Sequence, residues 1–572
     1  MNQNNKTSYP PKTTAHQHRD WLVKDEKTGN ILGIHIGNHE KDHAFKIELK
    51  HLKLKDIFTF VDNLRSRITI ETLKQHITML VVLFSILIAA LIRLWYAHLQ
   101  VVDFWGDSYH HWMISRLILA NDWGYTDYKG MEIVWLPTYH YLISIVMFLW
   151  QRFDMVPTYF INSLFGTLTC GLAAWLVADM SKSWWAGLVA GLTLAILPWY
   201  VAYNHINMPE VVSGLLLLTS FALVRKKSYK WLAILAIIST LTRHELTFLL
   251  GIMGGWLFWH SQWRMLFSLG LGTLLALIAW SSWSWHITGD VLEWWTQSQL
   301  AAAWDAQFGM KTGTRPIVGI GKIQETLLQV YPPLYITGIA LLLGITYKLW
   351  WVRMVYYSWL LMILVMVHWI FISFLVVRHL PTLDPRFLLI TVPLLVCVGS
   401  LIIAAIPRRK TRQVFWGLHF VVLLFSLEQI PTFAKKAYIL APERAIGEHL
   451  GTIAKEGGGY FWIDAPTSIY YSGLPPELFF SSDHILPNEK RWLKNTPALA
   501  LAAIKQNDIR YILWEDVSYS FVGQVWPQMS IGQAFEQGNY RFEPVFHYSG
   551  WELKYGANPT ILWQVKSLNH FD

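Results

Sequence analysis

Charged residues are scarce in this chain. Only 15% of its 572 residues are Asp, Glu, Lys or Arg, whereas 53% are hydrophobic. A typical soluble domain carries about 25% charged residues, so the deficit argues against an ordinary soluble protein. Tryptophan, in contrast, occurs 32 times, and this residue is enriched where membrane helices meet water. The composition therefore indicates a membrane protein.

Other common features are also missing. The only two cysteines, Cys170 and Cys397, lie in apolar runs, and we interpret them as small buried residues. The first ~70 residues lack the basic-then-apolar pattern of a cleavable signal peptide, so we expect the first membrane helix to be an uncleaved anchor. The glycines at Gly457–Gly459 precede a strand-like segment and no helix, which excludes a dinucleotide-binding fingerprint.

The net charge of +9 reflects membrane topology rather than nucleic-acid binding, because the positive residues fall mostly between apolar runs. A run of ~20 apolar residues crosses the ~30 Å hydrocarbon core of a bilayer. We find such runs at 77–99, 158–179, 184–203, 210–224, 231–259 (long enough for a pair), 265–286, 333–348, 354–377, 386–406 and 413–430.

The run Ile133–Gln151 decides the topology. If it crosses the membrane, the basic cluster Arg225–Lys230 and the later basic clusters lie outside, against the positive-inside tendency. If it is a helix that dips into the first outer loop, all these clusters lie inside, with about eleven spans. We predict the second arrangement, with a cytoplasmic N-terminus and an outward C-terminal domain.

Three domains follow from these patterns. Residues 1–76 form a cytoplasmic tail with a small β segment and an interfacial helix, and 77–432 form the transmembrane domain. The histidines of "HIGNHEKDH" match no zinc-binding spacing. From 433 to 572, helix-like "PERAIGEHLGTIAKEG" and "PALALAAIKQND" alternate with strand-like "YFWIDA" and "IRYILWED", which predicts an extracytoplasmic α/β domain.

Ionisable residues at the predicted ends of the membrane helices are the functional candidates, since such groups are costly at membrane depth. In "VVDFWGDSYHHW", Asp107, His110 and His111 share one face of a helix. Two alternatives stay open: Asp103 can simply cap that helix, and the two histidines can be interfacial residues that bind nothing.

Three later segments bring similar groups to the same predicted side of the membrane. They are "NHINMPEVV", "LTRHELTF" and "HLPTLDPRFLL". A carboxylate from these segments can accept a proton from a hydroxyl group, and arginines can hold a phosphate leaving group. Alternatively, Arg243 and Glu245 form a purely structural ion pair.

On these residues the sequence resembles the GT-C-fold glycosyltransferases, most closely the protein O-mannosyltransferase and aminoarabinose-transferase type. The stretches that carry the resemblance are "WGDSYHHWMISRLI", "WLPTYHYLISIV", "NHINMPEVVSGLLLL", "LTRHE" and "PRFLLITVPLL". It covers roughly 77–407. It implies transfer of a sugar from a polyprenyl-phosphate donor to a hydroxyl of a protein, lipid or glycan acceptor, by single displacement with inversion. Because the sequence shows no retention signal or organelle address, we expect a prokaryotic plasma membrane.

The resemblance also implies residue roles. Asp107 would be the general base, with Glu210 supporting it or the acceptor, and Arg386, Arg243 and Lys129 would bind the lipid phosphate. The other predicted substrate-binding residues are His110, His111, Glu132, His205, Asn207, Glu245 and Asp384.

Ser108 follows Asp107 where many relatives have a second acid, so we predict that no cofactor is required. If a divalent cation contributes, its ligands would be Asp107, Glu210 and His111. Two rival functions are a transporter or flippase of lipid-linked sugars and a non-catalytic membrane scaffold. No motif occurs twice, which argues against a transporter built from internal repeats.

Overall fold

The computed structural model describes residues 22–24, 31–34, 70–99, 103–127, 135–296, 325–346, 356–378, 386–431, 440–457, 460–481, 497–515, 521–550 and 560–568. Residues Met1–His76 and Ile77–Asp572 form two separate compact units. In the first unit, β1 (Leu22–Lys24) and β2 (Ile31–Ile34) pair antiparallel, which confirms the small β segment. The histidine-rich segment of the tail and residues 57–69 of the expected interfacial helix lie outside the described residues.

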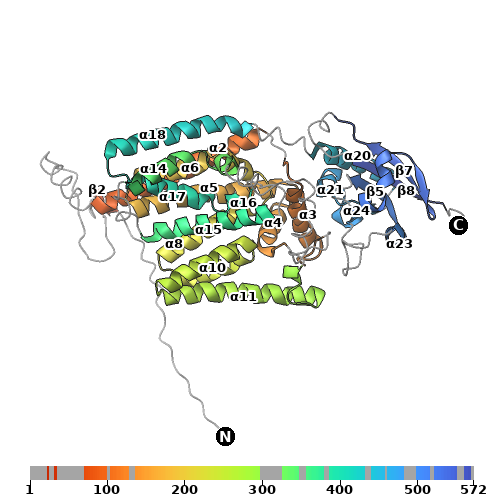
Figure 1. Cartoon of the computed structure of the whole chain (residues 1–572), viewed down its shortest axis with the longest axis horizontal. Helices are drawn as coiled ribbons and strands as arrows, with labels where there is room; N and C mark the ends of the chain where they lie inside the picture. The colour runs from red at the N-terminus through yellow and green to blue at the C-terminus, as the bar shows by residue number, and fades with distance from the viewer. Residues whose placement is uncertain are drawn as a thin grey trace, which may run out of the picture. The chain divides into compact units, whose positions relative to one another are not determined.

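Helices occupy the apolar runs that the sequence singled out (Figure 1). They are α2 (Ile70–His98), α5 (Val156–Ser181), α6 (Trp184–Ile196), α7 (Pro198–Tyr203), α8 (Glu210–Arg225), α9 (Tyr229–Thr240), α10 (His244–Trp259), α11 (Trp263–Thr288), α14 (Leu334–Thr346), α15 (Tyr356–Arg378), α16 (Arg386–Leu389), α17 (Val392–Ala405) and α18 (Arg409–Ser426).

The helix breaks refine the predicted runs. The expected pair within 231–259 is confirmed, because α9 ends at Thr240 and α10 begins at His244. The predicted single runs 184–203 and 386–406 were wrong in detail, since each contains two helices. Pro198 begins α7, and proline cannot continue a preceding helix because it lacks the backbone N–H. Pro393 lies in the same way near the start of α17.

Glycines let neighbouring helices approach closely. A Cβ atom at Gly187 of α6 would lie 2.4 Å from the carbonyl oxygen of Ala174 in α5, and one at Gly272 of α11 would lie 2.2 Å from that of Ala233 in α9. Small residues at helix contacts are typical of membrane bundles, in which close backbone packing replaces the hydrophobic drive of water.

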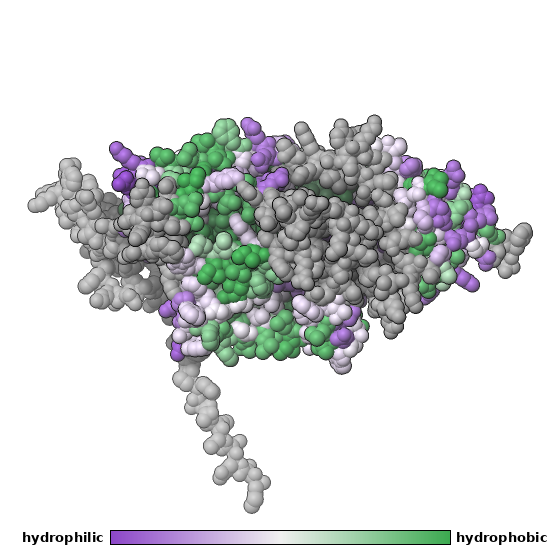
Figure 2. All heavy atoms as spheres, in the orientation of Figure 1, coloured by the Kyte–Doolittle hydropathy of each residue, from purple (hydrophilic) through white to green (hydrophobic). Residues whose placement is uncertain are grey.

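The helical part carries large apolar side chains on its surface (Figure 2). Examples are Leu80 in α2, Phe267 in α11 and Phe425 in α18, which are 64%, 70% and 71% exposed. Among the described residues, three helices are long and apolar enough to cross a membrane: Thr72–His98, Val156–Ser181 and Trp263–Thr288. Exposed apolar surface on this scale indicates a membrane-embedded domain. The number of spans and their orientation stay predictions.

Two further helices, α3 (Gly106–Ala120) and α4 (Pro137–Trp150), pack against each other between α2 and α5 in the chain order. Helix α4 has 14 residues, and its place as a helix that dips into the outer loop stays a prediction. The backbone N–H of Thr138 donates to the carbonyl oxygen of Leu241, so the start of α4 is bonded to the α9–α10 junction.

The C-terminal part is an α/β domain, as predicted. Its six-stranded mixed sheet has the order β4-β3-β5-β8-β7-β6, in which β4, β3 and β5 are parallel and the remaining pairs are antiparallel. The strands are β3 (Tyr460–Trp462), β4 (Phe479–Phe480), β5 (Ile509–Glu515), β6 (Phe535–Gln537), β7 (Tyr540–His547) and β8 (Thr560–Ser567). The helices are α20 (Ala441–Gly457), α21 (Pro466–Ser472), α23 (Pro497–Asn507) and α24 (Phe521–Val525).

Helix α21 connects this domain to the first loop. It packs against α3, and the hydroxyl groups of Tyr109 and Tyr471 are hydrogen-bonded at 3.2 Å. The ring of Tyr470 packs edge-on against Trp112 of α3, at a centroid distance of 4.9 Å. The C-terminal domain therefore rests directly on the helix that carries Asp107.

Candidate active site

Asp103 fixes the start of α3. Its carboxylate accepts hydrogen bonds from the backbone N–H groups of Trp105, at 3.2 Å, and Asn207, at 3.1 Å. The side chain is fully buried, and this burial raises the pKa of Asp103 to about 7. Asp103 does not itself cap α3, whose N-cap residue is Trp105 without a side-chain cap, but it binds backbone groups next to the helix start rather than facing a substrate.

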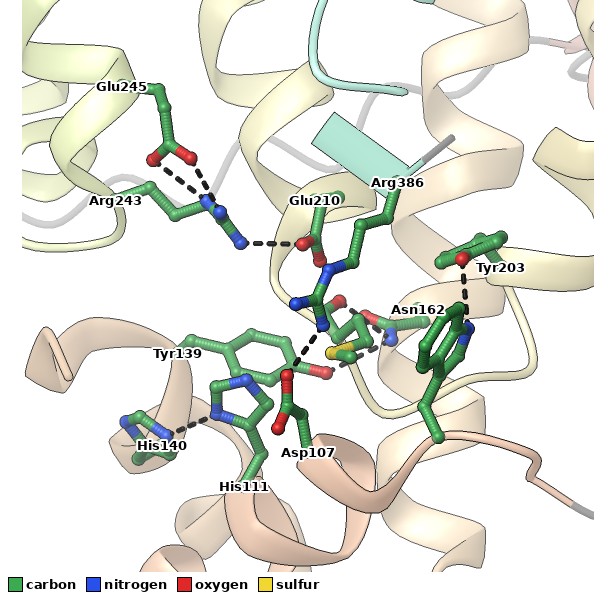
Figure 3. A network of polar contacts seen from close by, with 12 residues as sticks. Asp107, His111, Tyr139, His140, Asn162, Tyr203, Glu210, Arg243, Glu245 and Arg386 are labelled. Atoms are coloured by element: carbon green, nitrogen blue, oxygen red, sulfur yellow. Dashed lines mark hydrogen bonds and ion pairs between the residues drawn. The ribbon is translucent and has the colours of Figure 1, made fainter. Parts of the chain in front are cut away.

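Asp107 lies on the first turn of α3 and forms an ion pair with Arg386. Nη1 of Arg386 donates to Oδ2 of Asp107 at 2.7 Å (Figure 3). The Arg386 guanidinium also lies over the rings of Trp105 and Phe387, at 5.5 and 5.0 Å. The Asp107 side chain is 40% exposed and that of Arg386 17%. Of the two carboxylates predicted to be catalytic, Asp107 is therefore the one a substrate can reach.

Glu210, Arg243 and Glu245 form a second, more deeply buried cluster. Arg243 donates from Nη1 to Oε1 of Glu210 at 2.6 Å, and to both carboxylate oxygens of Glu245 at 2.6 and 3.0 Å. The Glu210 side chain is only 1% exposed. Glu210 begins α8, where the partial positive charge of the helix N-terminus also favours a carboxylate. Arg243 and Glu245 therefore do form an ion pair, with Glu210 as its third member.

The two clusters are neighbours. Arg386 lies close enough to Glu210 and Arg243 for direct electrostatic interaction, and Figure 3 shows its side chain between Glu210 and Asp107. The residues come from α3, from α8, from the α9–α10 junction and from α16. Polar groups that the sequence separates by hundreds of residues thus meet at one place.

The two adjacent histidines of α3 have different partners. Nε2 of His110 lies 2.7 Å from Oδ1 of the fully buried Asp127, whereas Nδ1 of His111 lies 2.8 Å from Nε2 of His140 in α4. Neither Asp127 nor His140 was among the predicted site residues. Figure 3 shows the His111 ring beside Asp107.

Asn207 connects three segments beneath these residues. Its side-chain amide donates to the carbonyl oxygen of Ser108 at 2.7 Å and accepts from the Tyr139 hydroxyl at 2.9 Å. Asn162 donates to that same hydroxyl at 3.0 Å. Asn207 thus holds the first turn of α3 against α4. His205, in contrast, packs against the rings of Tyr96 and Tyr159.

Three predicted site residues lie outside the described residues, namely Lys129, Glu132 and Asp384. The residues that the sequence missed are Trp105, Asp127, Tyr139, His140 and Asn162. Two of these, Tyr139 and His140, belong to the "YHY" segment of α4, Tyr139–Tyr141. The polar residues of this segment interrupt an apolar run, which is a feature that the sequence shows.

The described residues include no group of three or more His, Cys, Asp and Glu side chains arranged to hold a metal ion. Asp107 and Glu210 each bind a guanidinium group instead. A divalent cation would have to compete with these arginines, so the donor set does not fit a tightly held metal. Independence from metal stays a prediction.

A similar fold, with a mostly helical domain followed by a C-terminal domain, occurs in solved structures of membrane glycosyltransferases. ArnT from Cupriavidus metallidurans bound to undecaprenyl phosphate has a TM-score of 0.55 at 11% identity, over 84% of this chain and 97% of ArnT. ArnT in the apo state has a TM-score of 0.53 at 11% identity, over 80% of this chain and 93% of ArnT. An oligosaccharyltransferase from Archaeoglobus fulgidus has a TM-score of 0.49 at 12% identity, over 81% of this chain and 72% of the oligosaccharyltransferase.

The chain shares the fold of ArnT, an aminoarabinose transferase, and this confirms the GT-C-like fold predicted from the sequence. At this level of identity the likeness concerns the fold. No protein-family model matches the sequence, and neither does any curated protein sequence.

Proposed function

We propose that the protein is a membrane glycosyltransferase that uses a polyprenyl-phosphate-linked sugar as donor. The observation that carries this proposal is the Asp107–Arg386 pair, in which a reachable carboxylate lies 2.7 Å from a guanidinium. A glycosyl transfer from such a donor needs both groups: a base for the acceptor hydroxyl and a cation for the departing phosphate. The shared fold with ArnT, whose crystal structure holds undecaprenyl phosphate, supports the same assignment.

Arg386 is better suited than Arg243 to bind the phosphate. Arg243 already makes three hydrogen bonds to Glu210 and Glu245, and these two carboxylates offset its charge. Arg386 has the more accessible partner, Asp107. A lipid phosphate that takes hydrogen bonds from Arg386 would loosen its pair with Asp107 and leave that carboxylate for the acceptor.

The reaction then has simple proton and charge balance. The acceptor hydroxyl transfers its proton to Asp107 while its oxygen attacks the anomeric carbon from the side opposite the phosphate. The bond between the anomeric carbon and the phosphate oxygen breaks, and Arg386 stabilises the charge of the leaving phosphate. One displacement inverts the anomeric configuration, through a transition state with oxocarbenium character.

Glu210 is a positioning residue in this proposal. Its buried carboxylate holds Arg243, and it lies beside Arg386. Together with Glu245 it adds negative charge behind Arg386, which keeps that guanidinium at the site before the phosphate arrives. This role replaces direct contact between Glu210 and the acceptor.

The test is a transfer assay with the full-length protein in lipid nanodiscs. A panel of undecaprenyl-phosphate-linked sugars is offered with peptide, lipid and glycan acceptors, and the product's anomeric configuration is determined by NMR. We expect one donor class to be consumed, with free undecaprenyl phosphate and an inverted glycoside as products. Movement of the lipid-linked sugar across the membrane without cleavage would instead show a flippase. If the protein neither transfers nor moves the sugar, the non-catalytic scaffold is the correct alternative.

A further inference from the structure

A hydrogen-bonded relay in the first loop fixes the protonation state of His140. The Tyr125 hydroxyl donates its proton to the carbonyl oxygen of Trp135, at 2.6 Å. Nδ1 of His140 lies 3.0 Å from the carbonyl oxygen of Leu136 and 3.2 Å from the Tyr125 hydroxyl. A carbonyl oxygen can only accept, and the Tyr125 proton is already used. Nδ1 of His140 must therefore carry a proton and donate it.

The same reasoning extends to His111. The His140 ring is buried, with only 1% of the residue exposed, and a charged imidazole is costly in such a place, so the ring is neutral and its Nε2 atom is an acceptor. Nδ1 of His111, 2.8 Å away, must therefore be the donor in the His111–His140 bond. His111 is buried as well, at 2% exposure, and burial disfavours a charged ring. A neutral His111 with a proton on Nδ1 has a bare Nε2 atom.

The ring that carries this bare atom lies next to the reacting groups. His111 and Asp107 are one turn apart on α3, on the same helix face, and Figure 3 shows the His111 ring beside Asp107, with Arg386 above it. Among the described residues Nε2 of His111 has no hydrogen-bond partner. An acceptor atom in this position is left for a substrate.

We propose that Nε2 of His111 accepts a hydrogen bond from a hydroxyl group of the donor sugar, and that His140 is the positioning residue that fixes His111 in this state. This inference rests on the proposed function. The acceptor hydroxyl has one proton, which Asp107 takes, so a second acceptor atom at the same place suits a different hydroxyl. The donor sugar supplies such hydroxyls beside its anomeric carbon.

The inference makes His111 a specificity-determining residue. A neutral imidazole with a bare Nε2 can accept a hydrogen bond but cannot donate one. The Nε2 atom of His111 therefore selects a sugar that has an O–H donor at the position facing it. A sugar with a carboxylate or a hydrogen in place of that hydroxyl is a poor substrate, because it leaves the Nε2 acceptor without a hydrogen bond in the complex.

Two substitutions separate binding from structure. His111→Gln keeps an amide oxygen near the place of Nε2 but loses the bond to His140, whereas His111→Asn keeps a group near Nδ1 and loses the acceptor at Nε2. We expect His111→Asn to lower kcat/KM for the donor about tenfold and His111→Gln to retain more activity. Neither change should alter undecaprenyl phosphate affinity. Equal rates for wild type and His111→Asn, or a greater loss in His111→Gln, would overturn the inference.

A measurement without activity checks the relay itself. The protein is labelled with 15N-histidine, and the His111 signals are assigned from their loss in His111→Gln. We expect a protonated Nδ1 and a bare Nε2 at neutral pH, and a change in this pattern in His140→Phe. A protonated Nε2 on His111 would refute the inference even if transfer occurs. Absence of transfer in the wild type, with the expected 15N pattern, would instead contradict the proposed function.

Discussion

Arg386, the first residue of α16, donates a hydrogen bond of 2.7 Å to Asp107, 279 residues earlier in the chain. The carboxylate is near the start of α3 in the first loop, and its partner belongs to a helix that packs against α8. This pair joins the segment assigned to the acceptor with the one assigned to the lipid phosphate. The two charge clusters of the site meet at this pair.

Arg386→Gln should weaken the binding of undecaprenyl phosphate about 10- to 100-fold, because charge-assisted hydrogen bonds to the phosphate contribute roughly 1.5–3 kcal/mol each. Arg386→Lys should lie between this variant and the wild type, since it keeps the charge but loses the planar fork. Native mass spectrometry of lipid-titrated protein measures the affinities. Arg152→Gln is the control, because Arg152 forms an exposed pair with Asp154. Equal affinity for wild type and Arg386→Gln would exclude Arg386 as the phosphate ligand.

Glu210→Gln should destabilise the fold by about 2 kcal/mol, because Arg243 loses one charge-assisted hydrogen bond in a buried setting. The loss should shrink when Arg243 is also replaced by Gln, as a double-mutant cycle would measure. Thermal unfolding in detergent gives the differences. Glu448→Gln serves as the comparison, since its pair with Arg444 is exposed and should contribute at most ~0.5 kcal/mol. If Glu210→Gln and Glu448→Gln lower the free energy of unfolding by the same small amount, the Glu210 cluster does not stabilise the protein.

Asp103 makes stability depend on pH. Its folded-state pKa of about 7 lies above the usual 3.8, so the native state holds this proton more tightly than the unfolded chain. The contribution of protonated Asp103 to the free energy of unfolding is fully present below about pH 4. It is lost as the pH rises to about 7, which lowers the stability by roughly 4 kcal/mol. The stability of wild type relative to Asp103→Asn should fall across that window and stay constant above it. A difference independent of pH would contradict the raised pKa.

Chelation should leave transfer intact. Asp107 and Glu210 each bind an arginine, and a cation held by carboxylates and a histidine would have to displace these guanidinium groups. We expect at most a weak stimulation by Mg²⁺ or Mn²⁺ after treatment with EDTA, measured as the initial transfer rate. A rate that vanishes with EDTA and returns with one metal would show that Asp107, Glu210 and His111 act as ligands after all.

The helices were predictable because apolar length and the positions of basic clusters are properties of the sequence itself. The turn between α9 and α10 was visible because polar residues interrupt a run too long for one helix. The helix break at Pro198 was missed because an apolar run hides it. The sheet order of the C-terminal domain was not predictable, since it depends on pairings such as that of β5 with β8, which are distant in the chain.

The site could be predicted only in part from the sequence. The charged candidates Asp107, Glu210, Arg243 and Arg386 stood out because such residues are costly beside a membrane. Their pairing did not, because the partner of each is set by the packing of α3, α8, α10 and α16. The sequence placed Arg243 with Glu245 and could not place it with Glu210. Asp127 was missed because its pairing with His110 depends on the fold, and the polar "YHY" segment did not by itself show that His140 faces His111.

The most direct test of the account is the Asp107→Asn variant, with transfer and lipid binding measured on the same preparation. Asparagine keeps the size of the side chain but cannot take the acceptor's proton. The account predicts a loss of transfer of about 10²- to 10⁴-fold with undecaprenyl phosphate still bound. Asp154→Asn, an exposed residue of the same loop, should transfer at the wild-type rate. An Asp107→Asn protein that transfers sugar as fast as the wild type would contradict the central claim.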